Sequence, residues 1–337
     1  MNVSGVSQTF FDRCGDAIEA EPGMAVDFSS VSSRFPGQFA PLDGRGILGY
    51  VADRGATQFY IHRSFALGDT LLGVPAARWV RERTGIEVEM RVSAGLASVV
   101  EALGVRATPI LKRSPEALGI KMDGVLERDH TDDSLGRLHR SHIYLRAFGV
   151  SEEIGRLDWS AELERFPEPK GIDWPERFVV VAPRGSNACK TLDVGAVEYL
   201  IRLLRSKDIS VFLVGDEMEI AKEEGVFPIW RSATVGELFY ILSRAEAAVV
   251  TDSAALWISH FASTPIVAIL GPSRAAERTA LHPLAPEGVV VVDAAARAGC
   301  EPCTERGERC GKSWRCMREN GGWMADEAFE GVLRFIE

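Results

Sequence analysis

The sequence contains no long hydrophobic run and few cysteines. None of its apolar stretches approaches the ~18–20 residues that a membrane-spanning helix needs. Its first residues also lack the basic-then-apolar pattern of a secretory signal, so we expect a cytoplasmic protein without a transmembrane segment. Only six of the 337 residues are cysteines, and four of them lie between Cys300 and Cys316. This grouping argues against a disulfide framework and favours a metal site in a reducing compartment.

The sequence also has fewer basic than acidic residues. The chain has 38 Lys and Arg against 48 Asp and Glu, a formal net charge of −10, which argues against a broad non-specific surface for nucleic acid but does not exclude a local basic patch. Hydrophobic residues make up 46% and charged residues 26%, as is ordinary for a soluble globular protein. A chain of 337 residues exceeds the ~250–300 at which a single core stops growing, so we expect two domains.

Strand and helix patterns alternate in two successive sets, which we assign to domains at 57–170 and 175–322. A proline-rich stretch at 164–177 is the candidate linker, and a helix is expected at 323–337. Residues 1–56 show weak periodicity and are expected to form an N-terminal extension. The two sets predict an α/β protein with two doubly wound, Rossmann-like domains facing each other across a cleft.

The most informative segment follows an apolar strand of the second set. Thr251, Asp252 and Ser253 place short polar side chains where a helix should begin. Residues 254–262 then form an apolar helix, and residues 266–270 a second buried strand. In a parallel sheet such a turn lies at the carboxyl edge, where free N–H groups at the helix N-terminus bind phosphate-bearing ligands. The alternative is an ordinary strand–helix–strand unit with a well-capped helix.

A second candidate site follows the first strand of the first set. Gly68 and Asp69 lie at an expected strand-to-helix turn, before a helix predicted over residues 70–84. A carboxylate there either caps the helix or acts as a general base that accepts a proton from a hydroxyl nucleophile.

A third candidate follows the first strand of the second set. Arg184, Gly185, Ser186 and Lys190 combine two cations, a flexible turn and a hydroxyl at a helix start, which suits a diphosphate. The spacing is not that of a P-loop. A solvated basic turn is the alternative.

The cysteines of the C-terminal region have the spacing Cys300-x2-Cys303-x6-Cys310-x5-Cys316. Four thiolates can close a tetrahedral shell around zinc or iron. Because no position of that shell stays open, we expect a structural metal and no catalytic one. The surrounding residues, 297–320, contain too few apolar side chains to pack unaided.

Several of these motifs together resemble glycosyltransferase family 9, the heptosyltransferase-like inverting enzymes of the GT-B fold. The resemblance spans roughly residues 57–337. It rests on the following marks: Gly68-Asp69-x-Leu71-x-x-x-Pro75, the pair Ser186 and Lys190, the stretch that runs from Asp252-Ser253 to Thr264-Pro265 and the Gly271-Pro272 turn, and the late cysteines.

The resemblance implies a transfer of heptose or a similar sugar from a nucleotide-diphosphate sugar such as ADP-heptose to an acceptor hydroxyl. Asp69 would be the catalytic base. The donor would be held by two loops: Arg184, Ser186, Lys190, Thr251, Asp252, Ser253, Ala254 and Ala255. The acceptor stays open among a glycolipid, a protein and a small molecule, and a homo-oligomer is one expected form.

Two positions depart from the family pattern, because Ala254 and Trp257 stand where members usually have glycine and histidine. An extra N-terminal piece together with cysteine-bound iron is typical of the heptosyltransferases that modify autotransporter proteins, and this favours iron over zinc. Two other functions stay open. One is a different GT-B sugar-nucleotide enzyme, such as an epimerase or hydrolase, and the other is a non-catalytic, metal-stabilised binding or scaffold protein.

Overall fold

The computed structural model describes most of the chain after residue 45 and three short strands before it. The described residues are 8–11, 17–20, 24–25, 46–53, 55–63, 66–110, 119–122, 139–150, 152–215, 222–229, 233–303, 310, 315–318 and 321–337. Parts of the expected N-terminal extension and of the cysteine-rich segment therefore lie outside the described residues.

The chain divides into two compact units. The first comprises Met1–Gly136 and Arg140–Gly155, and the second comprises Arg137–His139 and Arg156–Glu337. The stretch 164–177, predicted as the linker, belongs to the second unit. None of the described helices is both long and apolar enough to cross a lipid bilayer.

Aromatic rings attach the stretch 164–177 to the second unit. Phe166 stacks on Phe239, with ring centroids 4.2 Å apart, and Trp174 stacks on Phe212 at 5.5 Å. Aromatic pairs of this kind add to the free energy gained from apolar burial. The prolines of this stretch thus lie in a segment that is packed on one unit.

The first unit contains a five-stranded parallel sheet in the order β3-β7-β4-β5-β6. Its strands are β3 (Met24–Ala25), β7 (Gly119–Lys121), β4 (Gln58–His62), β5 (Glu87–Val92) and β6 (Arg106–Pro109). The edge strand β3 comes from within the first 56 residues. Because β5 and β6 lie on one side of β4 and β7 lies on the other, the strand order reverses between β4 and β7, as in a doubly wound sheet.

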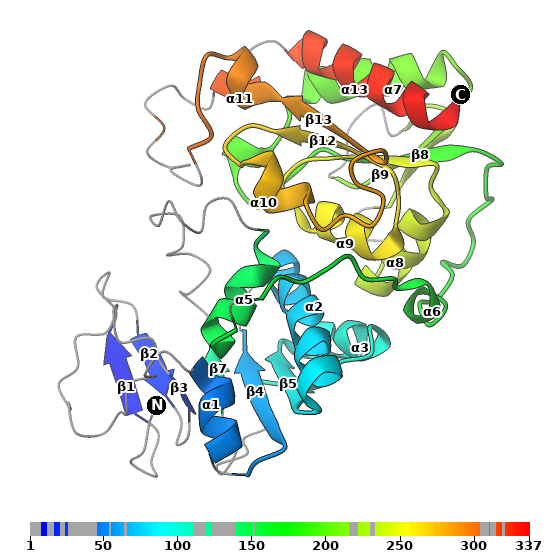
Figure 1. Cartoon of the computed structure of the whole chain (residues 1–337). Coiled ribbons are helices and arrows are strands. Elements are labelled where there is room, and N and C mark those ends of the chain that lie inside the picture. Colours follow the sequence, from blue (N-terminus) through cyan, green and yellow to red (C-terminus); the bar gives the residue numbers. More distant parts are fainter. Residues whose placement is uncertain are drawn as a thin grey trace. The chain divides into compact units, whose positions relative to one another are not determined.

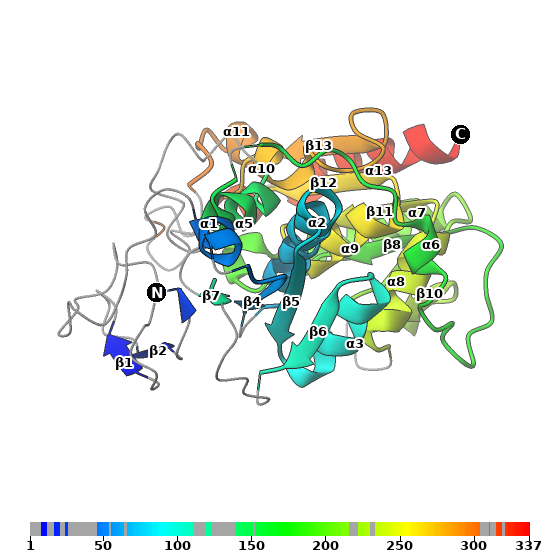
Figure 2. The same cartoon turned by 60° about the horizontal axis from the view of Figure 1, so that its bottom comes forward.

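Helices α1 (Gly46–Asp53), α2 (Leu67–Thr84), α3 (Ala94–Ala102) and α5 (Ser141–Phe148) accompany this sheet. Figure 2 shows α3 beside β6, a pairing that residue contacts confirm. Strands β1 (Gln8–Phe11) and β2 (Ala17–Ala20) form a separate antiparallel pair. Helix α2 begins at Leu67, three residues before the predicted start, and runs through Pro75. Most of its residues from 70 to 80 are buried, so tertiary packing outweighs the unfavourable helix propensity of proline.

The second unit contains a six-stranded parallel sheet in the order β10-β9-β8-β11-β12-β13. Its strands are β10 (Val226–Pro228), β9 (Ser210–Leu213), β8 (Phe178–Ala182), β11 (Ala247–Val250), β12 (Ile266–Leu270) and β13 (Val289–Asp293). Every residue of β8, β11 and β12 is buried, as expected for central strands covered on both faces. The order reverses between β8 and β11.

Helices cover both faces of this sheet. Figure 1 shows α7 (Val194–Arg205) and α13 (Gly321–Ile336) on one face, with α8 (Val235–Arg244) and α9 (Ala254–Ala262) on the other. Shorter pieces complete the described part of the unit: α6 (Ser160–Leu163), the 3₁₀ turn η3 (Ala188–Lys190), α10 (Ala275–Thr279), α11 (Ala294–Arg297) and α12 (Arg315–Arg318). Local sequence starts two of the helices, because Asp193 caps α7 and Thr234 forms a capping box with Glu237 at α8.

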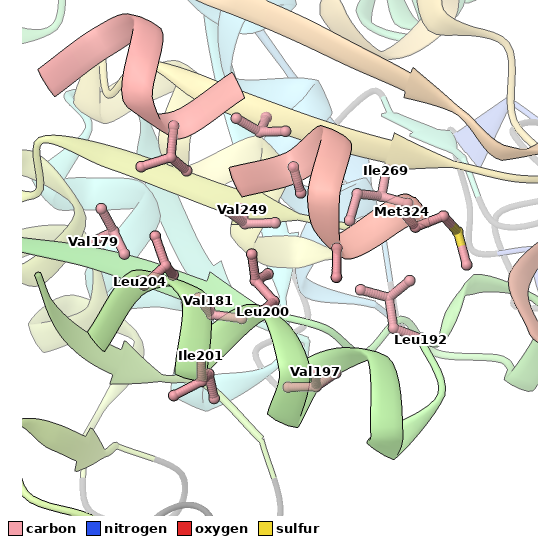
Figure 3. Close-up of a cluster of buried hydrophobic side chains, with 14 of the residues drawn as sticks. Val179, Val181, Leu192, Val197, Leu200, Ile201, Leu204, Val249, Ile269 and Met324 are labelled. Atoms are coloured by element: carbon pink, nitrogen blue, oxygen red, sulfur yellow. The ribbon is translucent and has the colours of Figure 1, made fainter. Parts of the chain in front are cut away.

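The core of the second unit lies between the sheet and the α7–α13 layer. Figure 3 shows side chains from strands and helices pointing into one cluster, among them Val181, Leu200, Val249 and Met324. All four are at most 1% exposed. The sheet, α7 and α13 thus share one apolar core.

Candidate functional site

The two predicted donor loops of the second unit meet at the switch point of its sheet. The loop 183–192 follows β8 and the turn 251–253 follows β11, and these two strands are direct parallel neighbours. In open α/β sheets, ligands bind outside the carboxyl ends of the strands where the order reverses. The structure therefore brings together loops that are about 65 residues apart in sequence.

Asp252 is the centre of a buried ion-pair network between these loops. Its Oδ2 lies 3.0 Å from Lys190 Nζ, and its Oδ1 lies 3.0 Å from Arg278 Nε. Ser273 Oγ donates a further hydrogen bond to Oδ2. All four side chains are at most 8% exposed. Lys190 and Asp252 were candidates from the sequence, whereas Ser273 and Arg278 were not, since neither stands in a recognised motif.

The charges in this network are balanced. Arg278 also pairs with the buried Glu277, at 3.1 Å from its Nη1 to Oε2, so two carboxylates face two cations. Burial by itself would raise the pKa of Asp252, but the nearby Arg278 guanidinium and Lys190 ammonium, with the Ser273 hydrogen bond, hold that pKa well below its ordinary value. Asp252 is therefore ionised throughout the physiological range.

Two hydroxyls beside Asp252 are buried without a hydrogen-bond partner among the described residues: Thr251 Oγ1 and Ser253 Oγ. Ser253 is the N-cap residue of α9, yet its side chain makes no capping hydrogen bond. The helix starts with Ala254 and Ala255, whose small side chains leave the first-turn N–H groups uncrowded. Buried polar atoms are rarely left unpaired, and free N–H groups at a helix start attract anions. This end of α9 is thus suited to an anionic group.

The loop after β8 is held close to the same point by Gly185. A Cβ at this position would lie 2.5 Å from the Cβ of Lys190 and 3.0 Å from the backbone oxygen of Asp252, so only glycine fits without displacement. Arg184 and Ser186 on either side are exposed. The loop therefore buries Lys190 and presents two polar side chains to solvent.

Trp257 lies in a buried aromatic cluster on α9. Its ring centroid is 5.4 Å from those of His139 and His260, and the Arg278 guanidinium carbon is 5.9 Å from it. Burial lowers the pKa of His260 well below its ordinary value, and the neighbouring His282 and His139 lower it further. Trp257 thus packs between Arg278 and the neutral imidazole of His260, so a large ring is accommodated at this position.

In the first unit, Asp69 lies in the first turn of α2 and does not cap it. The N-cap residue is Ala66, with φ +60° and no side-chain capping bond, so the capping alternative is wrong. Asp69 Oδ2 accepts a hydrogen bond from Arg63 Nη2 at 2.5 Å, and its backbone oxygen accepts one from Tyr144 at 2.6 Å. The Asp69 side chain is 25% exposed, against 2% for Arg63. A buried arginine therefore fixes an accessible carboxylate, and nothing in the sequence singled out Arg63 for that task.

The predicted four-cysteine metal site is not confirmed by the described residues. None of these four cysteines forms a disulfide, and no group of three or more histidine, cysteine or acidic residues in the described part of the chain is arranged to hold a metal ion. Burial raises the pKa of Cys316 to about 11, and the charges of Cys300, Cys303 and Cys310 each contribute to that rise.

Comparison with known proteins gives matches in structure only. No family model matches the chain, and no match was found among curated proteins. The iron-containing dodecameric glycosyltransferase TibC of enterotoxigenic E. coli H10407 matches with a TM-score of 0.61 at 16% identity, over 83% of this chain and 77% of TibC. This chain has the fold of the heptosyltransferases.

Two further structures match with TM-scores just above 0.5. E. coli heptosyltransferase WaaC with ADP has a TM-score of 0.52 at 14% identity, over 74% of this chain and 96% of that one. The family 9 glycosyltransferase from Veillonella parvula DSM 2008 has a TM-score of 0.51 at 11% identity, over 82% and 97%. These matches confirm the two-domain, Rossmann-like GT-B fold class that the sequence predicted.

Proposed function

We propose that this chain is an inverting glycosyltransferase that uses a nucleotide-diphosphate sugar, with ADP-heptose as the leading donor. The observation that carries the proposal is the start of α9, where two buried hydroxyls without a described partner meet free helix N–H groups at a sheet switch point. The fold supports it, since TibC has been solved with ADP-D-β-D-heptose and WaaC with ADP.

In this proposal the donor diphosphate lies at the start of α9. Thr251, Ser253 and the N–H groups of Ala254 and Ala255 contact its oxygens, and the exposed Arg184 and Ser186 approach it from the loop after β8. Lys190 and Asp252 hold these two loops together through their ion pair. The lysine adds positive charge near the leaving group.

The proposed reaction begins at Asp69, which accepts the proton of the acceptor hydroxyl. The oxygen then attacks the anomeric carbon from the face opposite the nucleotide. As the new carbon–oxygen bond forms, the bond between that carbon and the diphosphate oxygen breaks, and the diphosphate leaves with the electron pair. Developing charge on it is stabilised by the start of α9 and by nearby cations, so no divalent metal is required.

A nucleotide-binding screen tests the donor assignment. Wild-type protein should be stabilised against heat by ADP more than by adenosine, and mass spectrometry with ADP-heptose and an acceptor should find a glycosylated product. Lys190→Ala should weaken ADP binding by about 1.5–3 kcal/mol, the range for hydrogen bonds to charged groups, and adenosine binding much less. Lys207→Ala, an exposed lysine of the same unit, is the matched control.

Other results of this screen would favour the two alternative functions. Release of free or epimerised sugar with no acceptor present would indicate a hydrolase or an epimerase. No stabilisation by ADP, UDP or GDP would contradict the glycosyltransferase proposal and favour a binding or scaffold protein. Equal loss of ADP and adenosine binding in Lys190→Ala would remove that lysine from the diphosphate site.

We further propose that Cys300, Cys303, Cys310 and Cys316 hold one structural iron or zinc ion. Two observations support this: the Cys-x2-Cys spacing and the iron contained in TibC. A metal ion binds cysteines as thiolates and so favours their deprotonation. Bound to four sulfurs, it would order the segment and take no part in sugar transfer.

Purified protein should therefore contain about one iron or zinc per chain, measured by elemental analysis. Visible absorption from thiolate-to-iron charge transfer would identify iron. Cys303→Ser should lower the metal content, whereas Cys14→Ser, which leaves all four cysteines intact, should not. Removal of the metal should increase hydrogen exchange within residues 297–320 and leave both sheets protected. A metal-free protein with disulfides among these cysteines would refute the site.

A further inference from the structure

Helix α12 lies at the end of the cysteine-rich segment. It packs against two segments whose side chains bind Asp252. It contacts η3, the turn that carries Lys190. It also contacts Gly271, which follows β12: a Cβ there would lie 2.7 Å from Cγ and Sδ of Met317 and 3.1 Å from Cys316 Sγ. Gly271 is therefore in direct contact with this helix, and no larger residue fits without displacing Met317.

Both contacts connect α12 to the carboxylate of Asp252. Gly271 is joined through Pro272, whose ring restricts the backbone, to Ser273, and Ser273 Oγ donates to Asp252 Oδ2. The η3 turn supplies Lys190, whose Nζ binds the same Oδ2. Asp252 in turn stands between the two buried hydroxyls at the start of α9. A shift of α12 is thus transmitted to the candidate donor site by two routes.

Met317 is the side chain that makes this connection rigid. It is 0% exposed and belongs to the apolar core between the sheet and α13. Interiors are close-packed, so a buried side chain in contact with a backbone turn transmits its own position to that turn. Cys316 precedes it directly, which ties the position of Met317 to the cysteines.

We propose that Met317 is a positioning residue for donor binding, which acts through its contact with Gly271 and through the packing of α12 on η3. The inference rests on the proposed function, because it assumes that the start of α9 binds a nucleotide diphosphate. It adds that Met317 acts on this site although it makes none of the contacts assigned to the diphosphate.

Calorimetric titration of the full chain with ADP tests this proposal. Met317→Ala should weaken ADP binding about tenfold, which is within the range of coupling between residues in contact, and Met317→Leu should restore it. Met324→Ala is the matched control: Met324 is also 0% exposed and in the same core, but lies on α13. It should lower the melting temperature comparably and leave ADP binding unchanged. Elemental analysis of each variant excludes loss of metal as the cause.

A second pair of variants keeps the proposal testable if Met317→Ala folds poorly. Gly271→Ala inserts a methyl group against Met317 and should also weaken ADP binding. In the double variant Gly271→Ala/Met317→Ala the shorter side chain leaves room for that methyl, so the combined loss should be smaller than the sum of the single losses. Equal ADP affinity in wild type, Met317→Ala and Gly271→Ala would overturn the inference alone. A wild type that binds no nucleotide diphosphate would overturn the proposed function, and this inference with it.

Discussion

Asp69→Asn should lower the rate of sugar transfer by ~10²–10⁴-fold, the usual contribution of a general base, while ADP binding stays intact. Asparagine has nearly the same shape as aspartate, and its side-chain oxygen can still accept the hydrogen bond from Arg63. The hydrogen bond from the Tyr144 hydroxyl to the backbone oxygen of residue 69 is unaffected. What is lost is the ability to take a proton from the acceptor hydroxyl. Product formation by mass spectrometry and ADP titration measure the two effects separately.

Glu82→Gln is the matched control for this experiment. Glu82 is an exposed carboxylate on the same helix and pairs with Arg78 one turn away, so its neutralisation changes the charge of α2 by the same amount. It should leave the transfer rate within about twofold of wild type, as expected for an exposed ion pair of small energy. Near-normal turnover in Asp69→Asn would remove Asp69 from the role of base.

Asp252→Asn should destabilise the second unit by about 3–5 kcal/mol, the cost of removing one partner from a buried ion pair. The substitution removes the carboxylate that pairs with both buried cations, Lys190 and Arg278. Urea denaturation measures the change in the free energy of unfolding. Asp173→Asn, an exposed aspartate of the same unit, should change it by less than about 0.5 kcal/mol.

A double variant separates charge from packing in this network. Asp252→Asn/Lys190→Met removes one carboxylate and one cation, so it restores the charge balance and should be more stable than the sum of the two single variants predicts. Strict additivity would mean that the 3.0 Å contact between Lys190 and Asp252 contributes nothing to stability.

The ion-pair network of Asp252 also makes the stability of the second unit depend on pH in the acid range. The pKa of Asp252 is lower in the folded protein than in the unfolded chain, so the unfolded chain binds the proton more readily. The contribution of ionised Asp252 to the free energy of unfolding is fully present above the pKa of about 3.9 that an aspartate has in the unfolded chain. It is lost as pH falls below that value. The difference in unfolding free energy between wild type and Asp252→Asn should therefore narrow as pH falls below about 4. The buried histidines are common to both proteins and cancel in that difference.

Local signals in the sequence were sufficient for the strand–helix–strand unit that holds the donor loops. Helix α9 and strand β12 have the predicted bounds, 254–262 and 266–270. Ser253 is the N-cap residue although its side chain makes no capping bond, and the helix ends at Ser263 in the left-handed conformation, just before Thr264-Pro265. The alternation of such units likewise predicted two doubly wound, Rossmann-like domains, and the resemblance to glycosyltransferase family 9 implied the GT-B fold class. These features depend on residues within a few positions of one another, which a single sequence displays directly.

The partners of the candidate site residues were decided by tertiary structure alone. Arg63 was not distinguished from other basic residues until the fold placed it beside Asp69, and Arg278 is 26 residues from the Asp252 that it binds. The sequence predicted Lys190 as a cation for a diphosphate, but the fold also buries it against Asp252. Ion pairs and buried contacts depend on which loops lie side by side at the edge of a sheet. The order of the strands determines which loops those are. By itself the sequence determined the elements and the chemistry of their loops, and only the packed sheet decided which of those side chains touch.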